Sequence, residues 1–311
     1  MAARWFRAGL CAAALAALAA CAVPPGSVRP MPQRPVTPTP VPPSAESVAL
    51  RAYYTRVERD LVSQGLLRQD GGGADTPFTA RMLAENFIRI ALYDEYVAQG
   101  GRLVQTTAES RLRRWESPIR MRLIFGESVP EARQDTDRGN VKDYAQRLAR
   151  LTRLPIRLTD ANPNFELMIL NEDERRASGP LLRSLVPNIS DAAVRTVTGM
   201  PRSTFCLVFA FSEGASPSYT RAVAVIRSEH PDLLRLSCVH EELAQAMGLA
   251  NDSPTARPSI FNDDEEFGLL TRQDELLLRI LYDRRLRPGM TEAEARPIVE
   301  AIAAELVGGE S

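Results

Sequence analysis

Apolar side chains recur at helical spacing in two segments near the start of the chain. Residues 45–69 and 77–99 both give the pattern of an amphipathic helix, and three glycines at 71–73 separate them. A glycine pair at 100–101 follows the second segment as a stop signal. The apolar stripe of that segment consists of Met82, Leu83, Phe87, Ile90, Ala91 and Tyr93. We therefore predict a helical hairpin within residues 44–110.

From about residue 111 the pattern changes to short strands that alternate with helices. Residues Ile119–Phe125 alternate apolar and basic side chains, as a half-buried strand does. The predicted strands are 119–125, 164–170, 205–211 and 222–226, and the predicted helices are 141–151, 173–185 and 233–248. This mixture predicts an α+β domain over residues 111–311.

Two capping sequences mark helices near the end of the chain. Thr271 can cap a helix that has Asp274 in its first turn. Thr291 and Glu294 form a capping box for a last helix that ends near Val307.

The first twenty residues have the organisation of a secretory signal. Two arginines precede an apolar run from Ala8 to Ala20, which is too short to span a bilayer as a permanent helix. The sequence Leu18-Ala-Ala-Cys21 then resembles the lipobox of bacterial lipoproteins. The resemblance implies cleavage before Cys21 and lipidation of its thiol. Because Ala22 is not aspartate, it also implies an outer-membrane anchor facing the periplasm. The alternative is an ordinary signal peptide that ends near a cysteine.

Residues 21–43 are rich in proline and lack apolar periodicity. Such a segment favours extended polyproline conformations, so we predict a semi-rigid tether. Without residues 1–20, 36 basic and 39 acidic side chains remain, which gives a formal charge of −3. This balance provides no basic face for nucleic acid, and we expect no nucleic-acid partner. The expected contact is with the membrane, through the lipid anchor.

Two cysteines remain in the mature chain after the signal is removed and Cys21 is lipidated. Cys206 and Cys238 would then lie in an oxidising compartment, which favours a disulfide between them. The alternative is a pair of buried free thiols, because a bridge requires Cα atoms within about 7 Å.

The segment Cys238–Asp252 contains the most informative motif. In the extended metalloprotease pattern H-E-x-x-H-x-x-G-x-x-H, a glutamate base lies among histidine ligands, and a glycine breaks the helix before the third ligand. The same spacing occurs here in a shifted register, at Glu241, Glu242, Gln245, Gly248 and Asn251. Each histidine position holds Glu, Gln or Asn, whereas the base position still holds Glu242. If His240 and Glu241 are taken as the first two residues of the motif, the position of the second histidine is Ala244, which cannot bind a metal.

Several segments together carry a family resemblance. They are the lipobox, Phe78–Phe87, Cys238–Asp252, Ile260–Phe267 and Leu281–Met290. In this combination the chain resembles an uncharacterised family of bacterial lipoproteins that carry a zincin-like domain of unknown function. The resemblance implies a zincin-like metallopeptidase fold for residues 111–311, with a degenerate, metzincin-related motif. It brings no established activity.

The zincin resemblance also implies a metal site. Transferred by register, the candidate ligands are Glu241, Gln245, Asn251, Asp252 and His240, and Glu242 would be the general base. Neutral amide oxygens suit Ca²⁺ or Mg²⁺ better than zinc, and the chain has only two histidines. The acidic run at 262–266 could add oxygen ligands, although a solvated loop is the simpler interpretation. The cofactor is therefore left as one divalent metal ion of unknown identity, or none.

Two functions are compatible with these residues. The first is a degenerate zincin module that binds a peptide or protein of the cell envelope through an edge strand. The alternative is an active metal-dependent peptidase with Glu242 as general base and a non-standard ligand set. A glycosidase that uses Glu241 and Glu242 is disfavoured, because adjacent helix residues project about 100° apart.

Overall fold

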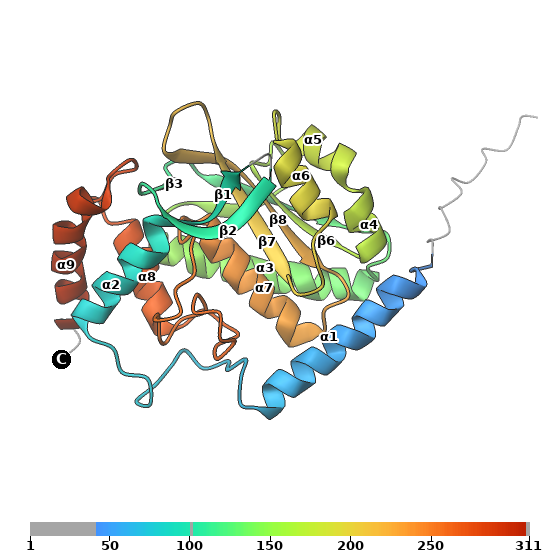
Figure 1. Cartoon of the computed structure of the whole chain (residues 1–311), viewed down its shortest axis with the longest axis horizontal. Coiled ribbons are helices and arrows are strands. Elements are labelled where there is room, and N and C mark those ends of the chain that lie inside the picture. Colours follow the sequence, from blue (N-terminus) through green and yellow to red (C-terminus); the bar gives the residue numbers. More distant parts are fainter. Residues whose placement is uncertain (1–41, 100–101, 309–311) are drawn as a thin grey trace, which may run out of the picture. The chain divides into compact units, whose positions relative to one another are not determined.

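A mostly parallel sheet forms the centre of the fold. The computed structural model describes residues 42–99 and 102–308, and Pro40–Ser311 cluster as one compact unit. The strand order is β3-β8-β6-β4-β5, and β7 also pairs with β8 (Figure 1). The strands are β3 (Arg114–Trp115), β4 (Ile119–Phe125), β5 (Ile156–Leu158), β6 (Phe165–Leu170), β7 (Cys206–Ser212) and β8 (Ser218–Arg227).

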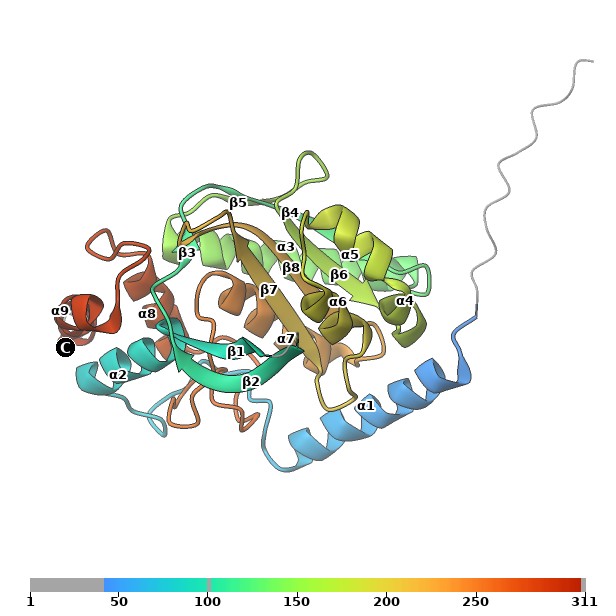
Figure 2. The same cartoon turned by 45° about the horizontal axis from the view of Figure 1, so that its top comes forward.

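Helices cover both faces of the sheet because its central strands are apolar on both faces. In β6, Phe165, Leu167 and Ile169 belong to the larger core, whereas Met168 and Leu170 belong to a smaller one. The helices α3 (Glu131–Thr152) and α7 (Asp232–Ala246) pack into the larger core. The helices α5 (Gly179–Leu185) and α6 (Asp191–Thr198) pack into the smaller core on the opposite face (Figure 2). Strands buried on both sides tend to be apolar along their length, and β6 is so apart from Glu166, which pairs with Arg122 of β4.

The strand β7 lies at an edge of the sheet and runs antiparallel to its neighbour. It pairs with β8 from Cys206↔Ile226 to Ser212↔Tyr219. Among the described residues β8 is its only ladder partner, and every residue of β7 is half-buried. The other pairings between β3, β4, β5, β6 and β8 are parallel.

The remaining elements extend the larger core beyond the sheet. The helix α2 (Ala80–Ala91) packs against α8 (Arg272–Leu281) and α9 (Glu292–Gly308). A hairpin of β1 (Tyr93–Gln99) and β2 (Arg102–Glu109) follows α2. The predicted helices near the chain end are confirmed, and α8 begins with the expected capping box of Thr271 and Asp274.

The helix α1 (Ala45–Ser63) lies apart from the other N-terminal elements and packs against α4 (Glu172–Ala177). It buries only Ser47 and Tyr54. The prediction of a helical hairpin is therefore wrong, since α1 and α2 contact different parts of the fold (Figure 1).

Several predicted helices have different bounds in the structure: α1 ends at Ser63 and not at 69, and α3 begins at Glu131 and not at 141. The segment 77–99 is a helix only to Ala91 and then becomes strand β1, because pairing with β2 satisfies the backbone of residues rich in Tyr and Val. The segment 173–185 contains two helices, α4 and α5, separated at Ser178 before a glycine and a proline. Local periodicity shows neither the strand partner nor the break.

The fold class is confirmed only in its coarse form, as a mixture of strands and helices. The sheet is mostly parallel and carries helices on both faces, which is an α/β arrangement. No helix among residues 42–99 and 102–308 combines the length and apolar character of a membrane span. The predicted signal, Cys21 and most of the proline-rich tether lie outside the described residues.

Candidate functional site

The motif lies on α7, directly after the central strand β8. Its apolar positions Val239, Leu243 and Ala246 are buried in the larger core, and this anchors one face of the helix. The helix ends before Gly248, whose φ of +122° is unfavourable for residues with a side chain. A Cβ atom there would also overlap the carbonyl oxygen of Arg113. The backbone conformation thus requires a glycine at this position of the motif, independently of any function of the site.

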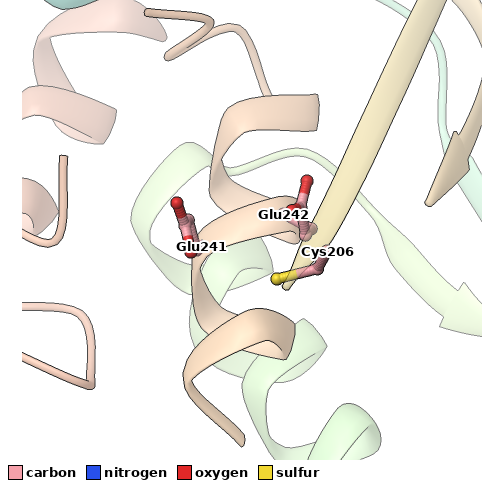
Figure 3. Close-up of side chains that lie close together, drawn as sticks. All are labelled: Cys206, Glu241 and Glu242. Atoms are coloured by element: carbon pink, nitrogen blue, oxygen red, sulfur yellow. The ribbon is translucent and has the colours of Figure 1, made fainter. Parts of the chain in front are cut away.

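Two carboxylates of α7 lie beside the first residue of β7. Ligand atoms of Glu241, Glu242 and Cys206 all lie within 4.8 Å of one another (Figure 3). Glu242 is 2% exposed, whereas Glu241 is half-buried. The adjacent glutamates therefore contribute to one cluster, although they are neighbours in the sequence.

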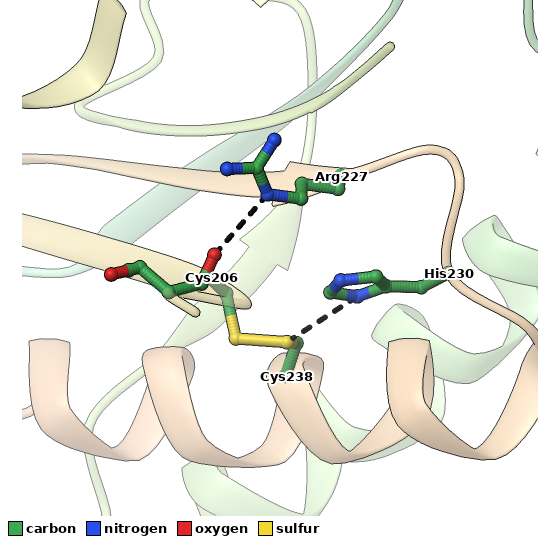
Figure 4. The surroundings of a disulfide bond; sticks show 5 residues. Cys206, Arg227, His230 and Cys238 are labelled. Carbon is green, nitrogen blue, oxygen red and sulfur yellow. Dashed lines mark hydrogen bonds between the residues drawn. A yellow bond between two sulfur atoms is a disulfide. The ribbon is translucent and has the colours of Figure 1, made fainter. Parts of the chain in front are cut away.

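The predicted disulfide between Cys206 and Cys238 is confirmed. Its Cα atoms are 5.9 Å apart, and it joins the start of β7 to the middle of α7 (Figure 4). While the bridge is intact the Cys206 sulfur is no thiolate ligand, so the cluster offers a metal only the two carboxylates.

The pair Gln245 and Asp252 is brought together where the chain returns after Gly248. The Gln245 side-chain nitrogen lies 3.4 Å from an Asp252 carboxylate oxygen. Desolvation raises the pKa of Asp263, and a hydrogen bond with Asp252 acts in the opposite direction. Desolvation and the charges of Asp263 and Asp264 also raise the pKa of Glu265. The loop after α7 thus gathers hard oxygen donors of the type that Ca²⁺ or Mg²⁺ prefers.

His240 makes the contacts of a structural residue. Its ring stacks on Tyr144 with centroids 3.9 Å apart, and its Nδ1 atom accepts a hydrogen bond from the Leu270 amide. Desolvation and then the charge of Arg147 lower the pKa of His240 to about 3. The imidazole is therefore neutral and belongs to the packing between α3 and the chain before α8.

Asn251 is used to hold α2 in place. Its side-chain nitrogen donates to the Arg89 carbonyl, and its backbone nitrogen donates to the Ile90 carbonyl. Of the predicted ligands, the structure thus groups Glu241 with the base position Glu242. It groups Gln245 with Asp252, while His240 and Asn251 make hydrogen bonds to other elements.

A second polar group, which is not part of the α7 motif, lies at the carboxyl ends of β6 and β8. We call it the carboxyl-edge cluster, and its members are Glu172, Arg227, Glu229, His230 and Arg235. All five side chains are buried. The sequence signal was a polar run, Arg227–His230, placed directly after an apolar strand, where α/β folds commonly bind ligands.

Ion pairs hold three members of this cluster, Glu172, Arg227 and Arg235. Glu172 pairs with Arg175 and Arg227. Burial acts to raise the pKa of Glu172, but the hydrogen bonds and charges of the two arginines outweigh it and lower that pKa. Arg235 pairs with Asp137, whose pKa burial raises despite the arginine. The buried charges of Glu172, Arg227 and Arg235 are therefore compensated by partners.

The helix α1 covers this cluster. The Ser47 hydroxyl donates to a Glu229 carboxylate oxygen at 2.6 Å, and the Tyr54 ring lies edge-on to His230 at 4.5 Å. Burial lowers the pKa of His230 well below its ordinary value, and the charges of Arg227 and Arg235 act in the same direction.

The architecture and the polar face of α7 define a class of protein. It is an α/β domain with a candidate functional site between the edge strand β7 and the helix α7, which follows the central strand β8. Residues 80–301 match the family "Protein of unknown function (DUF2927)", and the chain belongs to this family. No curated protein and no solved structure matches the chain. The helix α1 lies outside the matched residues.

Proposed function

We propose that the protein is an outer-membrane lipoprotein whose zincin-like, catalytically degenerate domain binds a peptide or protein of the cell envelope. The order of elements supports the zincin-like part. Strand β4, helix α3 and strands β5 and β6 come first, the short helices α4 to α6 follow, and strands β7 and β8 then lead to helix α7, which carries the degenerate motif. Apart from α4 to α6, this is the order of elements in the upper subdomain of zincin metallopeptidases.

The edge strand β7 is the observation that carries the binding proposal. One edge of β7 pairs with β8, and alternate backbone groups of an antiparallel strand point away from its partner. Its half-buried apolar residues Leu207, Phe209 and Phe211 provide side-chain contacts on the same strand. An extended chain can add to such an edge by β-augmentation.

Hydrogen exchange with and without a ligand tests the binding proposal. Peptidoglycan stem peptides and extended peptides from outer-membrane proteins are the probes. Binding is expected to slow exchange in Cys206–Ser212 and to leave the central strand β6 unchanged. Binding that protects only other segments, or no binding by any of these probes, would reject β7 as the docking edge.

A metal-dependent peptidase is the second candidate, and the pairing of Asp252 with Gln245, one helical turn after Glu241 on α7, favours it. The test is the metal content of protein purified without chelator, compared with Glu241→Ala and Gln245→Ala. A stoichiometric metal lost in both variants would support a peptidase and justify a substrate screen, with Glu242→Gln as the inactive control. Metal-free protein with both variants folded would leave the binding module as the remaining proposal.

A further inference from the structure

The side chains around the disulfide are of the types that bind zinc in proteins. The Cys206 sulfur is within 4.8 Å of carboxylate oxygens of Glu241 and Glu242. The Cys238 sulfur, bonded to it, lies 3.8 Å from Nδ1 of His230. Thiolate, imidazole and carboxylate are the three ligand types that zinc takes from proteins.

Three separate elements bring these groups together. Cys238, Glu241 and Glu242 have the spacing i, i+3 and i+4 on α7, so they share one face of the helix. Cys206 comes from the start of β7, and His230 comes from the connection between β8 and α7 (Figure 3, Figure 4). Tertiary packing thus brings these side chains to one region of the fold, where Cys206 lies with the two glutamates and Cys238 lies with His230.

His230 is an unusual neighbour for a structural disulfide. The residue is 1% exposed, and its Nε2 atom has no hydrogen-bond partner among the described residues. Its Nδ1 atom has the Cys238 sulfur as its neighbour. Most buried side-chain nitrogens make a hydrogen bond, so this ring has donor or acceptor capacity that the folded, oxidised chain does not use.

We propose that reduction of the Cys206–Cys238 disulfide creates a zinc site. The ligands are the two cysteine sulfurs, the His230 imidazole and a carboxylate of Glu241 or Glu242. A dithiol reductant supplies two electrons and two protons, becomes a disulfide itself, and leaves two thiols in the protein. Zinc binding then displaces the two thiol protons to solvent and forms two sulfur–zinc bonds.

Charge explains why the two redox states differ. The disulfide sulfurs are neutral, whereas two thiolates beside Glu241 and Glu242 would place like charges close together in a partly buried space. A divalent cation relieves this repulsion, and soft thiolates favour zinc over calcium or magnesium. Glu241 is half-buried, so one of the proposed ligands is partly exposed to solvent. This inference is independent of peptide binding at β7.

Cobalt binding to the full-length protein, before and after reduction with a phosphine, tests the proposal. Cobalt replaces zinc, and a sulfur-to-cobalt charge-transfer band reports thiolate ligands. We expect one cobalt per chain and this band only after reduction, with displacement by zinc. Glu241→Gln or Glu242→Gln should weaken binding at least about tenfold, because removing a ligand costs at least as much as disturbing its support.

Two variants provide the controls. Cys206→Ser combined with Cys238→Ser should bind no cobalt in either condition. Gln245→Ala should bind as the wild type does, which separates this site from a zincin-type site that requires Gln245. Equal binding before and after reduction, or an equal loss in Gln245→Ala, would overturn the proposal.

Circular dichroism measures whether reduction unfolds the chain. Recovery of the helical signal on addition of zinc, together with the cobalt band, would support a site that stabilises the reduced fold. Reduced protein that zinc neither binds nor refolds would overturn the proposal.

Discussion

At the scale of single residues, neighbouring positions of the α7 motif have different physical roles. His240 is buried against Tyr144, whereas Glu241 is half-buried beside the disulfide. Gly248 is set by backbone geometry, since both its φ angle and the Arg113 carbonyl oppose a side chain. The spacing of the motif alone would assign metal binding to all of these positions.

The buried state of His240 predicts a pH dependence of stability. The pKa of His240 is about 3 in the folded protein, and about 6.5 is ordinary for an unfolded chain. Only the unfolded state takes up this proton as the pH falls below about 6.5, so the folded state loses stability there. By pH 5 this histidine should lower the free energy of unfolding by about 2 kcal/mol.

Denaturant unfolding of wild type and His240→Gln between pH 7 and pH 5 measures this effect. The variant should be less stable at pH 7, because it loses the stacking and the Leu270 hydrogen bond. The difference between the two proteins should then shrink by about 2 kcal/mol towards pH 5. Parallel stability curves would contradict the assignment of this pH dependence to His240. Other groups with shifted pKa values, such as His230 and Asp274, are present in both proteins and contribute equally to the two curves.

Gly248→Ala should destabilise the protein by about 2–4 kcal/mol, because the new Cβ meets the Arg113 carbonyl in an unfavourable backbone conformation. Gly139→Ala is the matched control. Gly139 lies inside α3, and a Cβ there meets nothing within 4 Å. The control should keep or raise the unfolding free energy. Equal effects of the two substitutions would argue against a special role for Gly248.

At the scale of elements, strong local patterns were predicted well. The strand 119–125 and the helix at 233–248 match β4 and α7 closely, because their apolar residues face one layer at the period of the element. The segment 77–99 failed in its second half, because the partner strand β2 decides its conformation. The helix α6 and the short strands β3 and β5 were missed, since each is too short for periodicity to be visible.

The helix α1 depends on few buried contacts, and this predicts local opening. Tyr54 is fully buried, and its hydroxyl donates to the Arg202 carbonyl. Tyr54→Ala should speed hydrogen exchange in α1 at least about tenfold, because the loss of this contact lowers the free energy of local opening by more than about 1.4 kcal/mol.

Exchange in α7 should change little in the same experiment, because α7 is held by the larger core. Tyr53→Ala is the control for α1, since Tyr53 is only partly buried and its ring packs on Tyr54 and Arg202. If both variants open α1 equally, Tyr54 is not its main anchor.

At the scale of the whole molecule, one core connects the parts that the sequence had divided. Phe87 of α2, Leu243 of α7 and Leu277 of α8 belong to the same buried cluster. The N-terminal segment and the region of the motif are therefore coupled in packing. The carboxyl-edge cluster adds charged groups from α4, β8 and the connection between β8 and α7.

Membrane attachment is predicted at this scale through Cys21, which lies outside the described residues. Wild-type protein should incorporate labelled palmitate and fractionate with the outer membrane. Cys21→Ser should lose the label and move to the soluble or uncleaved fraction, because the lipidated thiol is the proposed anchor. Cys11→Ser is the control within the signal and should behave as wild type. Palmitate labelling that persists in Cys21→Ser would reject the lipobox assignment.

The sequence by itself determined the elements with strong periodicity, the caps of α8 and α9, and the two cysteines available for a bridge. These depend on residues close together in the chain. Only the tertiary structure decided that Cys206 meets Glu241 and Glu242, that Gln245 meets Asp252, and that α1 closes over the carboxyl ends of β6 and β8. Such contacts join residues far apart in sequence, or depend on the direction of side chains around a helix. Local periodicity contains neither kind of information.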